Sequence, residues 1–339
     1  MNPHLALYYT QMFHLPRIGI LRGGPSNEYE VSLLSGATVL KTLRNNFADQ
    51  YTPHDIFIDR SGIWHFDGIE TAPHNISHRI DLAWNALHGN YGEDGKIQSF
   101  LETHGIPFTG SGSLSSAVGM NKVLSKKVFK DHGIKSPYFR EFNSEDIALN
   151  LEGIVKNLFE SFLLPAIVKP VSSGSSVGVY LIRSYDQLPE ALREAAMHSD
   201  TVMIEEFIPG VEASCGVVEG FRGQELYALP PIEIRPDSHF FDYEAKYAGK
   251  SREIVPATFP DDIKQAIEEL AKSIHRVLGL KHYSRSDFIV HPRRGVYALE
   301  VNTLPGLTEE SLMPKALRAV GSDTHELVGH VIGLVLGRK

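Results

Sequence analysis

The sequence predicts a mixed α/β protein of more than one domain, opening with a doubly wound α/β unit. The chain has 339 residues, whereas a single compact domain usually holds about 100–200. Near the N-terminus, a short apolar strand runs into a glycine-rich turn and then into a helical pattern, which is typical of such a unit. Further along, two pairs of β-rich segments are separated by polar turns, which predicts hairpins.

The first unit is predicted from two strands and the turns that follow them. Residues 17–21 form the first strand, residues 22–26 the glycine-rich turn, and residues 33–43 carry apolar side chains at helical spacing. Residues 81–87 form a second strand that ends at His88. Because ligands bind beyond the carboxyl ends of such strands, both turns are expected to face one crevice.

The middle of the chain alternates basic and apolar segments. Residues 115–132 predict one basic helix. Residues 165–170 and 177–182 predict a hairpin with a Ser/Gly tip, and residues 201–207 predict a further strand. A last helix is expected over residues 324–336.

A second hairpin gives the strongest chemical signal. Its strands are residues 284–291 and 296–302, joined by a four-residue turn with Pro early and Gly late. If the turn is centred between Arg293 and Arg294, the numbers of two residues that face each other across the strands sum to 587. Asp287 then faces Glu300, and two carboxylates directly opposite each other should repel.

A cation between these carboxylates would remove the repulsion. Arg285 would face Asn302 on the same side of the hairpin, so the oxygen donors of Asp287, Glu300 and Asn302 suit Mg²⁺ that shares its ligands with phosphates. The alternative is a solvated polar face on which Arg285 bridges both acids. The Pro/Gly-containing loop at 303–312 favours the cation site because it brings backbone N–H groups beside this face.

Composition excludes several classes of protein. Lys and Arg total 33 and Asp and Glu total 41, so the net charge of −8 argues against a general nucleic-acid binder. The single cysteine, Cys215, cannot form an internal disulfide or a cysteine-based zinc site, and we expect it to be buried. No stretch approaches the ~18 apolar residues of a membrane span, and residues 1–16 are a poor signal peptide. We therefore expect a cytoplasmic enzyme.

Two partial motifs do not fit their context, and two phosphate-binding motifs are absent. Residues 174–178 match G-x-S-x-G, but a nucleophile elbow needs a helix after the serine, and the following residues favour a strand. The first glycine turn lacks G-x-G-x-x-G, and the chain has no P-loop motif. His74 and His78 have the spacing of a metal pair but no adjacent Glu, so two solvated histidines are expected.

Six segments in order resemble one family, the D-alanine–D-alanine ligases, which are ATP-grasp enzymes. The segments are residues 21–32, 87–98, 109–112, 120–122, 241–247 and 300–306. The resemblance extends over residues 17–336. It implies an N-terminal extension at 1–16, a Rossmann-like substrate-binding domain at 17–112, a central ATP-grasp lobe at 113–208, and a C-terminal lobe at 209–339 with the metal and second-substrate sites. The sheets of the two lobes are expected to be mixed or antiparallel.

The resemblance implies an ATP-dependent ligation of two D-alanine molecules through an acyl phosphate, for peptidoglycan precursors. It also implies two Mg²⁺ or Mn²⁺ ions, no nucleic-acid or membrane partner, and a homodimer. The alternatives are a D-alanine–D-lactate or D-alanine–D-serine ligase, or another ATP-grasp amino-acid ligase. Tyr247 in the lid favours the dipeptide product, because depsipeptide-forming relatives lack this tyrosine.

The resemblance also assigns roles to residues of this chain. The ATP-binding residues would be Lys122, Lys169, Ser175, Glu205, Glu206, Phe207, Ile208, Glu212 and Lys246. The amino-acid substrates would contact Glu30, His88, Arg285, Ser311 and Leu312. The catalytic residues would be Glu30, Ser175, Tyr247, Arg285 and Gly306. The metal ligands would be Asp287, Glu300 and Asn302. Asn121 departs from the family pattern, in which an Asp usually precedes the lysine.

Overall fold

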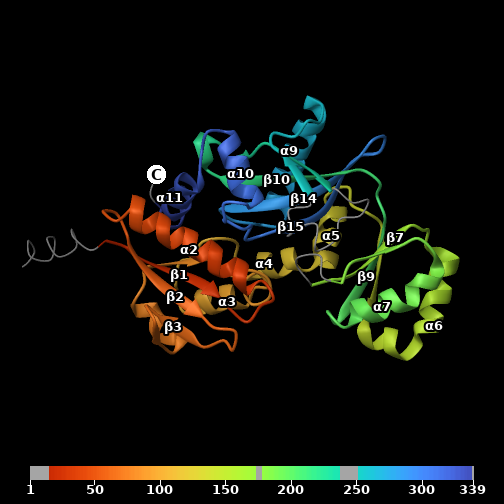
Figure 1. The fold of residues 1–339 in the computed structure, drawn as a ribbon, viewed down its shortest axis with the longest axis horizontal. Coiled ribbons are helices and arrows are strands. Elements are labelled where there is room, and N and C mark those ends of the chain that lie inside the picture. Colours follow the sequence, from red (N-terminus) through yellow and green to blue (C-terminus); the bar gives the residue numbers. More distant parts are fainter. Residues whose placement is uncertain (1–14, 173–177, 237–250, 338–339) are drawn as a thin grey trace, which may run out of the picture.

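The structure is a computed structural model that describes residues 15–172, 178–236 and 251–337. Its strands form three sheets of five, four and six strands. Figure 1 shows the first sheet in red and orange at one end of the molecule, the second at the other end, and the third between them. In the part of the chain that the structure describes, no helix has the length and apolar character needed to cross a membrane.

The first sheet has the strand order β4-β3-β2-β1-β5, with β1 paired in parallel to both β2 and β5. Its strands are β1 (Arg17–Gly23), β2 (Thr52–Ile58), β3 (Trp64–Phe66), β4 (Ile69–Glu70) and β5 (Leu82–Asn85). Its helices are α2 (Tyr29–Asn46), η1 (Pro73–His78) and α3 (Lys96–Thr103). The predicted strands at 17–21 and 81–87 are confirmed as β1 and β5, whereas β2, β3 and β4 were not predicted.

Helix α2 packs very close to β1. A Cβ added at Gly36 of α2 would lie 2.5 Å from the Cβ of Arg22 in β1. The glycine at this position therefore lets the helix approach the strand, and it brings the side chains of the first turns of α2 toward the end of β1.

The predicted basic helix at 115–132 is wrong in one respect, because the structure has two helices there. They are α4 (Ser113–Met120) and α5 (Lys122–Asp131). Asn121 separates them with an extended backbone, and its side-chain oxygen accepts hydrogen bonds from the amides of Val123 and Leu124, both at 3.0 Å. Asn121 is thus the N-cap of α5, a role in which Asn and Asp perform equally well.

The second sheet is antiparallel, with the order β6-β9-β7-β8. Its strands are β6 (Phe139–Asn143), β7 (Ala166–Pro170), β8 (Tyr180–Ile182) and β9 (Thr201–Glu206), and its helices are α6 (Ser144–Ser161), η2 (Tyr185–Gln187) and α7 (Leu188–Ala196). The predicted hairpin is confirmed as β7 and β8, and among the described residues β8 begins at Tyr180. Residues 173–177 of its tip lie outside the described residues.

The third sheet is also antiparallel and has the order β13-β12-β10-β14-β15, with β11 paired to β10. Its strands are β10 (Val211–Glu219), β11 (Leu226–Ala228), β12 (Ile232–Pro236), β13 (Ser251–Ile254), β14 (Tyr283–His291) and β15 (Gly295–Asn302). The helices of this part are η3 (Phe221–Gly223), α9 (Asp261–Val277), α10 (Leu312–Ala319) and α11 (Thr324–Val335). The predicted terminal helix is confirmed as α11.

The register of β14 and β15 changes along the hairpin. Asp287 pairs with Glu300 as predicted, but Phe288 pairs with Ala298, so Leu299 is the extra residue of a β-bulge. The predicted register is therefore correct at the Asp287 end and wrong by one residue toward the turn. The turn is one residue shorter than expected, since His291 already pairs with Gly295.

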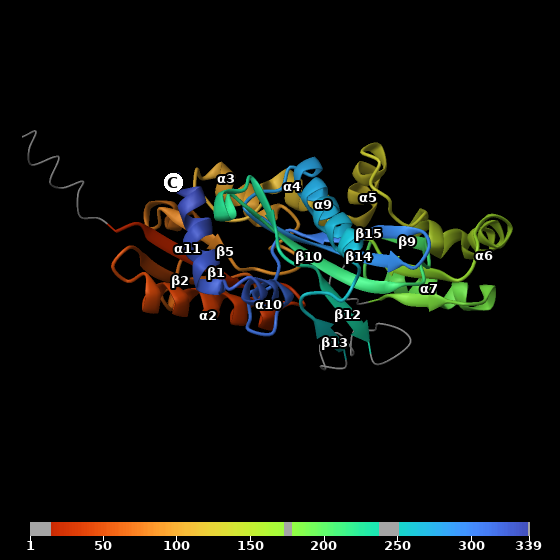
Figure 2. The same cartoon turned by 90° about the horizontal axis from the view of Figure 1, so that it is seen from above.

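The first and third sheets share one hydrophobic core. It joins Ile18 of β1, Val39 of α2, Leu304 of the loop after β15, and Val328 of α11. The second sheet has a separate core, which includes Val168 and Leu192. Figure 2 shows the same arrangement from above, with α11 beside α2 and the second sheet at the far end.

Candidate active site

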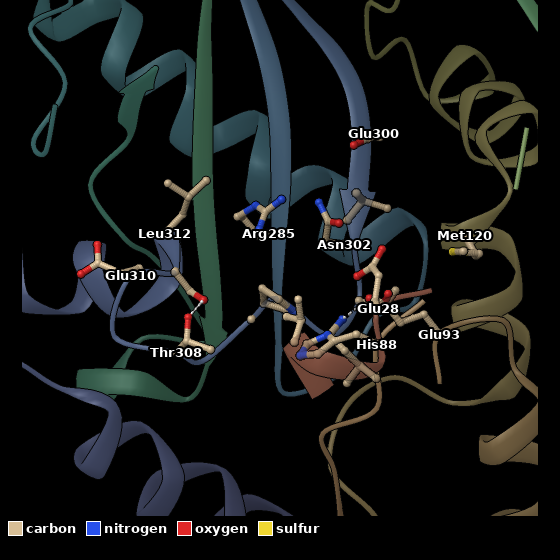
Figure 3. Close-up of a pocket in the computed structure, with 18 of the residues that line it drawn as sticks. Glu28, His88, Glu93, Met120, Arg285, Glu300, Asn302, Thr308, Glu310 and Leu312 are labelled. Atoms are coloured by element: carbon tan, nitrogen blue, oxygen red, sulfur yellow. Dashed lines mark hydrogen bonds between the residues drawn. The ribbon is translucent and has the colours of Figure 1, made fainter. Parts of the chain in front are cut away.

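A pocket of about 360 Å³ lies where the first sheet, α4 and the β14–β15 hairpin meet. Figure 3 shows side chains from these elements pointing into it. Eight of the residues predicted for the site line the pocket: His88, Lys122, Arg285, Glu300, Asn302, Gly306, Ser311 and Leu312. Its other polar lining residues are Glu28, Glu93, Glu253, Thr303, Thr308 and Glu310.

The two opposed carboxylates of the hairpin each have their own cation. The guanidinium of Arg285 donates to Asp287 from Nε at 3.0 Å and from Nη2 at 2.9 Å. Asp287 also accepts from Ser214 Oγ at 2.6 Å and from Asn302 Nδ2 at 3.0 Å. Lys122 Nζ lies 3.3 Å from Glu300 Oε2.

The donor set on this face fits a hard divalent cation. Asp287 and Glu300 are directly paired and offer two carboxylates, and Asn302, two residues further along β15 and opposite Arg285, offers an amide oxygen. Oxygen donors of this kind suit Mg²⁺ or Mn²⁺ that also binds phosphate. The residues at hand are therefore compatible with the metal that the family resemblance implies.

Three buried charges form a second cluster, between α5, β7 and β9. Lys126 Nζ lies 3.1 Å from Glu205 Oε2, and Lys169 Nζ donates to Glu205 Oε1. Burial lowers the pKa of Lys126 to about 8, against the attraction of Glu205. Burial acts to raise the pKa of Glu205, but the two lysines hold it below its usual value.

Lys126 was not singled out from the sequence. Its position four residues after Lys122 puts both lysines on one face of α5, which is the only signal that could have found it. Lys126 is fully buried and Lys169 nearly so, so this face of α5 turns its cations toward the interior.

Four other predicted ATP-binding residues lie at the end of β9, in the segment that follows it, and at the start of β10. Glu206 accepts a hydrogen bond from Arg294 Nη1 at 2.7 Å. Ile208 is buried against Ile289 and Tyr297, and Phe207 and Glu212 are half-buried. Ser175, Lys246 and Tyr247 lie outside the described residues.

The end of the pocket nearest the first sheet carries a cluster of Glu28, His88 and Glu93, whose polar atoms lie within 4.8 Å of one another. Burial raises the pKa of Glu93 to about 8, and the negative charge of Glu28 adds to this shift. Burial lowers the pKa of His88, so the imidazole is neutral at pH 7. At this pH the cluster therefore holds a protonated Glu93 and a neutral His88.

The structure does not bring Glu30 to the pocket. The side chain of Glu30 is 72% exposed and pairs with Arg60 at 2.8 Å. Glu28 lines the pocket instead. Helix α2 begins at Tyr29, so Glu28 is the non-helical N-cap residue and Glu30 lies in the first turn. The two side chains therefore leave the backbone in different directions. The sequence signature contains both, and the periodicity alone does not separate them.

The opposite end of the pocket is formed by the start of α10. Ser311 is the N-cap residue of α10, and its Oγ lies 2.7 Å from Thr308 Oγ1. Backbone N–H groups at a helix N-terminus bind carboxylates well. Lys315 of α10 joins Glu253 and Glu310, each at 2.9 Å, along the same rim.

An antiparallel four-stranded sheet that carries the buried Lys169, and an antiparallel six-stranded sheet that carries the opposed carboxylates, define an ATP-grasp enzyme. The family model described as D-ala D-ala ligase C-terminus matches residues 128–333, and the one described as D-ala D-ala ligase N-terminus matches residues 68–111. The chain belongs to the D-alanine–D-alanine ligase family.

Similar proteins cover nearly the whole chain. The D-alanine–D-alanine ligase of Geobacter sulfurreducens is 39% identical over 318 residues, or 93% of each chain. That of Leptospira interrogans is 35% identical over 354 residues, covering 96% of this chain and 99% of its own. Among solved structures, the VanG D-Ala:D-Ser ligase of Enterococcus faecalis has a TM-score of 0.83 at 30% identity, covering 95% of this chain and all of its own. The D-alanine–D-alanine ligase of Coxiella burnetii has a TM-score of 0.80 at 26% identity, covering 96% and 95%.

Proposed function

We propose that this protein joins two D-alanine molecules to D-alanyl-D-alanine at the expense of ATP, for peptidoglycan precursors. The observation that carries the proposal is a single pocket that is lined by Glu300 and Asn302 of the hairpin at one side and by Glu28 and His88 at another. Asp287 does not line the pocket, but it faces Glu300 across the hairpin. Family membership supports the same reaction.

The first D-alanine binds at the Glu28 end of the pocket in this proposal. Its ammonium pairs with the carboxylate of Glu28, which takes the role that the sequence assigned to Glu30. Its carboxylate lies toward His88 and Arg285, which line the same cavity. Arg285 is held in place by its two hydrogen bonds to Asp287.

ATP binds between the second and third sheets, with its phosphates toward Lys122 and Lys169. The carboxylate oxygen of the first D-alanine attacks the γ-phosphorus, the bond to the β-phosphate oxygen breaks, and ADP leaves. Asp287, Glu300 and Asn302 would hold Mg²⁺ or Mn²⁺, which would neutralise charge on the phosphates. The protein's part in this step is mainly positioning and charge neutralisation.

The second D-alanine places its carboxylate at Ser311 and at the amide of Leu312, at the N-terminus of α10. Its amine, after losing a proton, attacks the carbonyl carbon of the acyl phosphate. This attack forms the C–N bond, and the tetrahedral intermediate then expels phosphate, which takes up the proton that the nitrogen loses as the amide forms. Arg285 and the N–H of Gly306 stabilise the negative oxygen of that intermediate.

Several expectations remain proposals on the family resemblance alone. They are the roles of Ser175, Lys246 and Tyr247, the homodimer, and a location in the cytoplasm, where ATP is available. Size-exclusion chromatography with light scattering tests the dimer, and a measured mass equal to that of one chain at the assay concentration would contradict it.

The reaction is tested by ADP release coupled to product analysis. We expect ADP and D-alanyl-D-alanine only when ATP, Mg²⁺ and D-alanine are all present. D-lactate or D-serine is then offered with D-alanine at equal concentration, at pH 7. Mostly mixed product would replace the proposed function with one of its alternatives, and equal turnover of L-alanine would refute both.

A further inference from the structure

Ser35 of α2 lies behind the pocket and contacts two of its walls. Its side chain is buried, at 1% exposure, and it does not line the cavity. Ser35 Oγ lies 2.9 Å from Nε2 of His88 and 3.4 Å from the amide nitrogen of Leu307. One hydroxyl therefore joins the imidazole of the first-substrate cluster to the loop that carries Gly306.

The directions of these hydrogen bonds follow from the hydroxyl of Ser35. The amide of Leu307 can only donate, so it occupies a lone pair of Ser35 Oγ. In the described part of the chain, the hydroxyl forms its other hydrogen bond with Nε2 of His88, which is therefore the acceptor of the hydroxyl hydrogen. The backbone of Leu304 acts to raise the pKa of His88, which agrees with a ring N–H on the Nδ1 side.

A neutral imidazole with its hydrogen on Nδ1 must accept at Nε2. The hydroxyl of Ser35 then donates to Nε2, and its lone pair is left to accept from the amide of Leu307. The resulting chain of hydrogen bonds runs from the amide of Leu307 through Ser35 to His88. Glu93 holds the other end of the same loop, since its Oε1 accepts from the amide of Leu304 at 3.3 Å.

We infer that Ser35 is a positioning residue, which selects the Nδ1–H form of His88 and ties this ring to Leu307, at one end of the segment 304–307 that presents the Gly306 amide. The inference rests on the proposed function for the role of Gly306. Ser35 itself touches no substrate. It acts by keeping the Gly306 N–H where the negative oxygen develops, and a displacement of a fraction of an ångström would weaken that contact.

Ser35→Ala tests the inference by kinetics and by nitrogen NMR. We expect kcat to fall about tenfold while the KM for ATP stays unchanged, because an interaction made in the transition state is lost. In protein labelled with ¹⁵N-histidine, His88 should show the Nδ1–H form in the wild type and a mixture of both tautomers in Ser35→Ala. A His88→Gln variant assigns the resonances.

Ser32→Ala is the matched control, because Ser32 is a buried hydroxyl in the same helix. It accepts from the amide of Gly23 and donates to the carbonyl of Ala86, both at 2.8 Å, and does not contact His88. Its loss should lower the melting temperature about as much as Ser35→Ala but leave the His88 tautomer unchanged.

Two results would overturn the inference: an unchanged kcat in Ser35→Ala, or the same His88 spectrum in Ser35→Ala as in the wild type. A change of tautomer in Ser32→Ala would also overturn it, because the effect would then be general to α2. If the wild type released no ADP with D-alanine, the proposed function would fail, whereas the NMR comparison would still decide the hydrogen-bond chain.

Discussion

Lys126 and Glu205 form an ion pair in the interior, with 3.1 Å between Nζ and Oε2, and both side chains are buried. Lys169 bonds the other oxygen of the same carboxylate. If Lys169 turns to the phosphates of ATP, Lys126 remains to balance Glu205. The buried lysine therefore keeps the carboxylate charged and in place beside the proposed ATP site.

Replacing Lys126 with Met should destabilise the protein strongly. Removing one partner of a buried pair leaves an uncompensated charge, which costs about 3–5 kcal/mol, and we expect the lower end because Lys169 still contacts Glu205. Urea unfolding measures this change, and the KM for ATP should rise.

Lys127→Met is the matched control, because Lys127 pairs with Glu141 on the surface with side chains 53% and 42% exposed. It should cost less than about 1 kcal/mol. Equal costs for the two variants would contradict the importance of the buried pair.

Glu28 and Glu30 provide a second matched comparison. Glu28→Gln removes the charge that faces the pocket. The kcat/KM for D-alanine should therefore fall roughly 30-fold, which corresponds to the loss of about 2 kcal/mol, the free energy of a hydrogen bond to a charged group. Glu30→Gln removes an exposed charge and should change kcat/KM less than about twofold. Initial rates over a range of D-alanine concentrations measure both. A large loss in Glu30→Gln with normal Glu28→Gln would return the role to Glu30.

Glu93 should make the stability of the substrate-free protein depend on pH. Its pKa is raised from 4.5 to about 8 in the folded state, so between these values the folded protein holds a proton that the unfolded chain has lost. The free energy of unfolding therefore falls as pH rises through this window. In Glu93→Gln the neutral amide lacks this contribution, so its stability relative to the wild type should increase from pH 5 to pH 8, by at most about 1.4 kcal/mol per pH unit. Parallel stability curves for the two proteins would refute the raised pKa.

Glu300→Gln should separate the cation site from the alternative of a solvated polar face. If Glu300 binds metal, the affinity for Mn²⁺ in the presence of ADP should fall at least about tenfold, because a charged ligand is lost. Electron paramagnetic resonance of free Mn²⁺ measures this affinity directly. Stability should change by about 1 kcal/mol or less, since the contact to Lys122 is partly exposed. Unchanged Mn²⁺ affinity would favour the polar face.

The sequence predicted the fold and much of the site because the relevant signals are local. The strands β1 and β5, the hairpins, and the pairing of Asp287 with Glu300 follow from alternation and turn residues. Other features depend on tertiary contacts. The buried state of Lys126 depends on where α5 packs, and the choice between Glu28 and Glu30 depends on the residue at which α2 begins. Neither is encoded in the hydrophobic period.

The bulge at Leu299 changes which positions of β15 face the core and so which substitutions each position tolerates. Before it, Val296 and Ala298 belong to the core packed on α9, and Tyr297 and Leu299 face Ile208 on the other side. With strict alternation Glu300 would enter the core, but the extra residue instead sets it opposite Asp287. In saturation mutagenesis of this strand, the alternation of apolar-only and tolerant positions should therefore be interrupted at residue 299. Positions 296, 298 and 301 should accept only apolar side chains. Deletion of residue 299 should be tolerated less well than any single substitution in the strand.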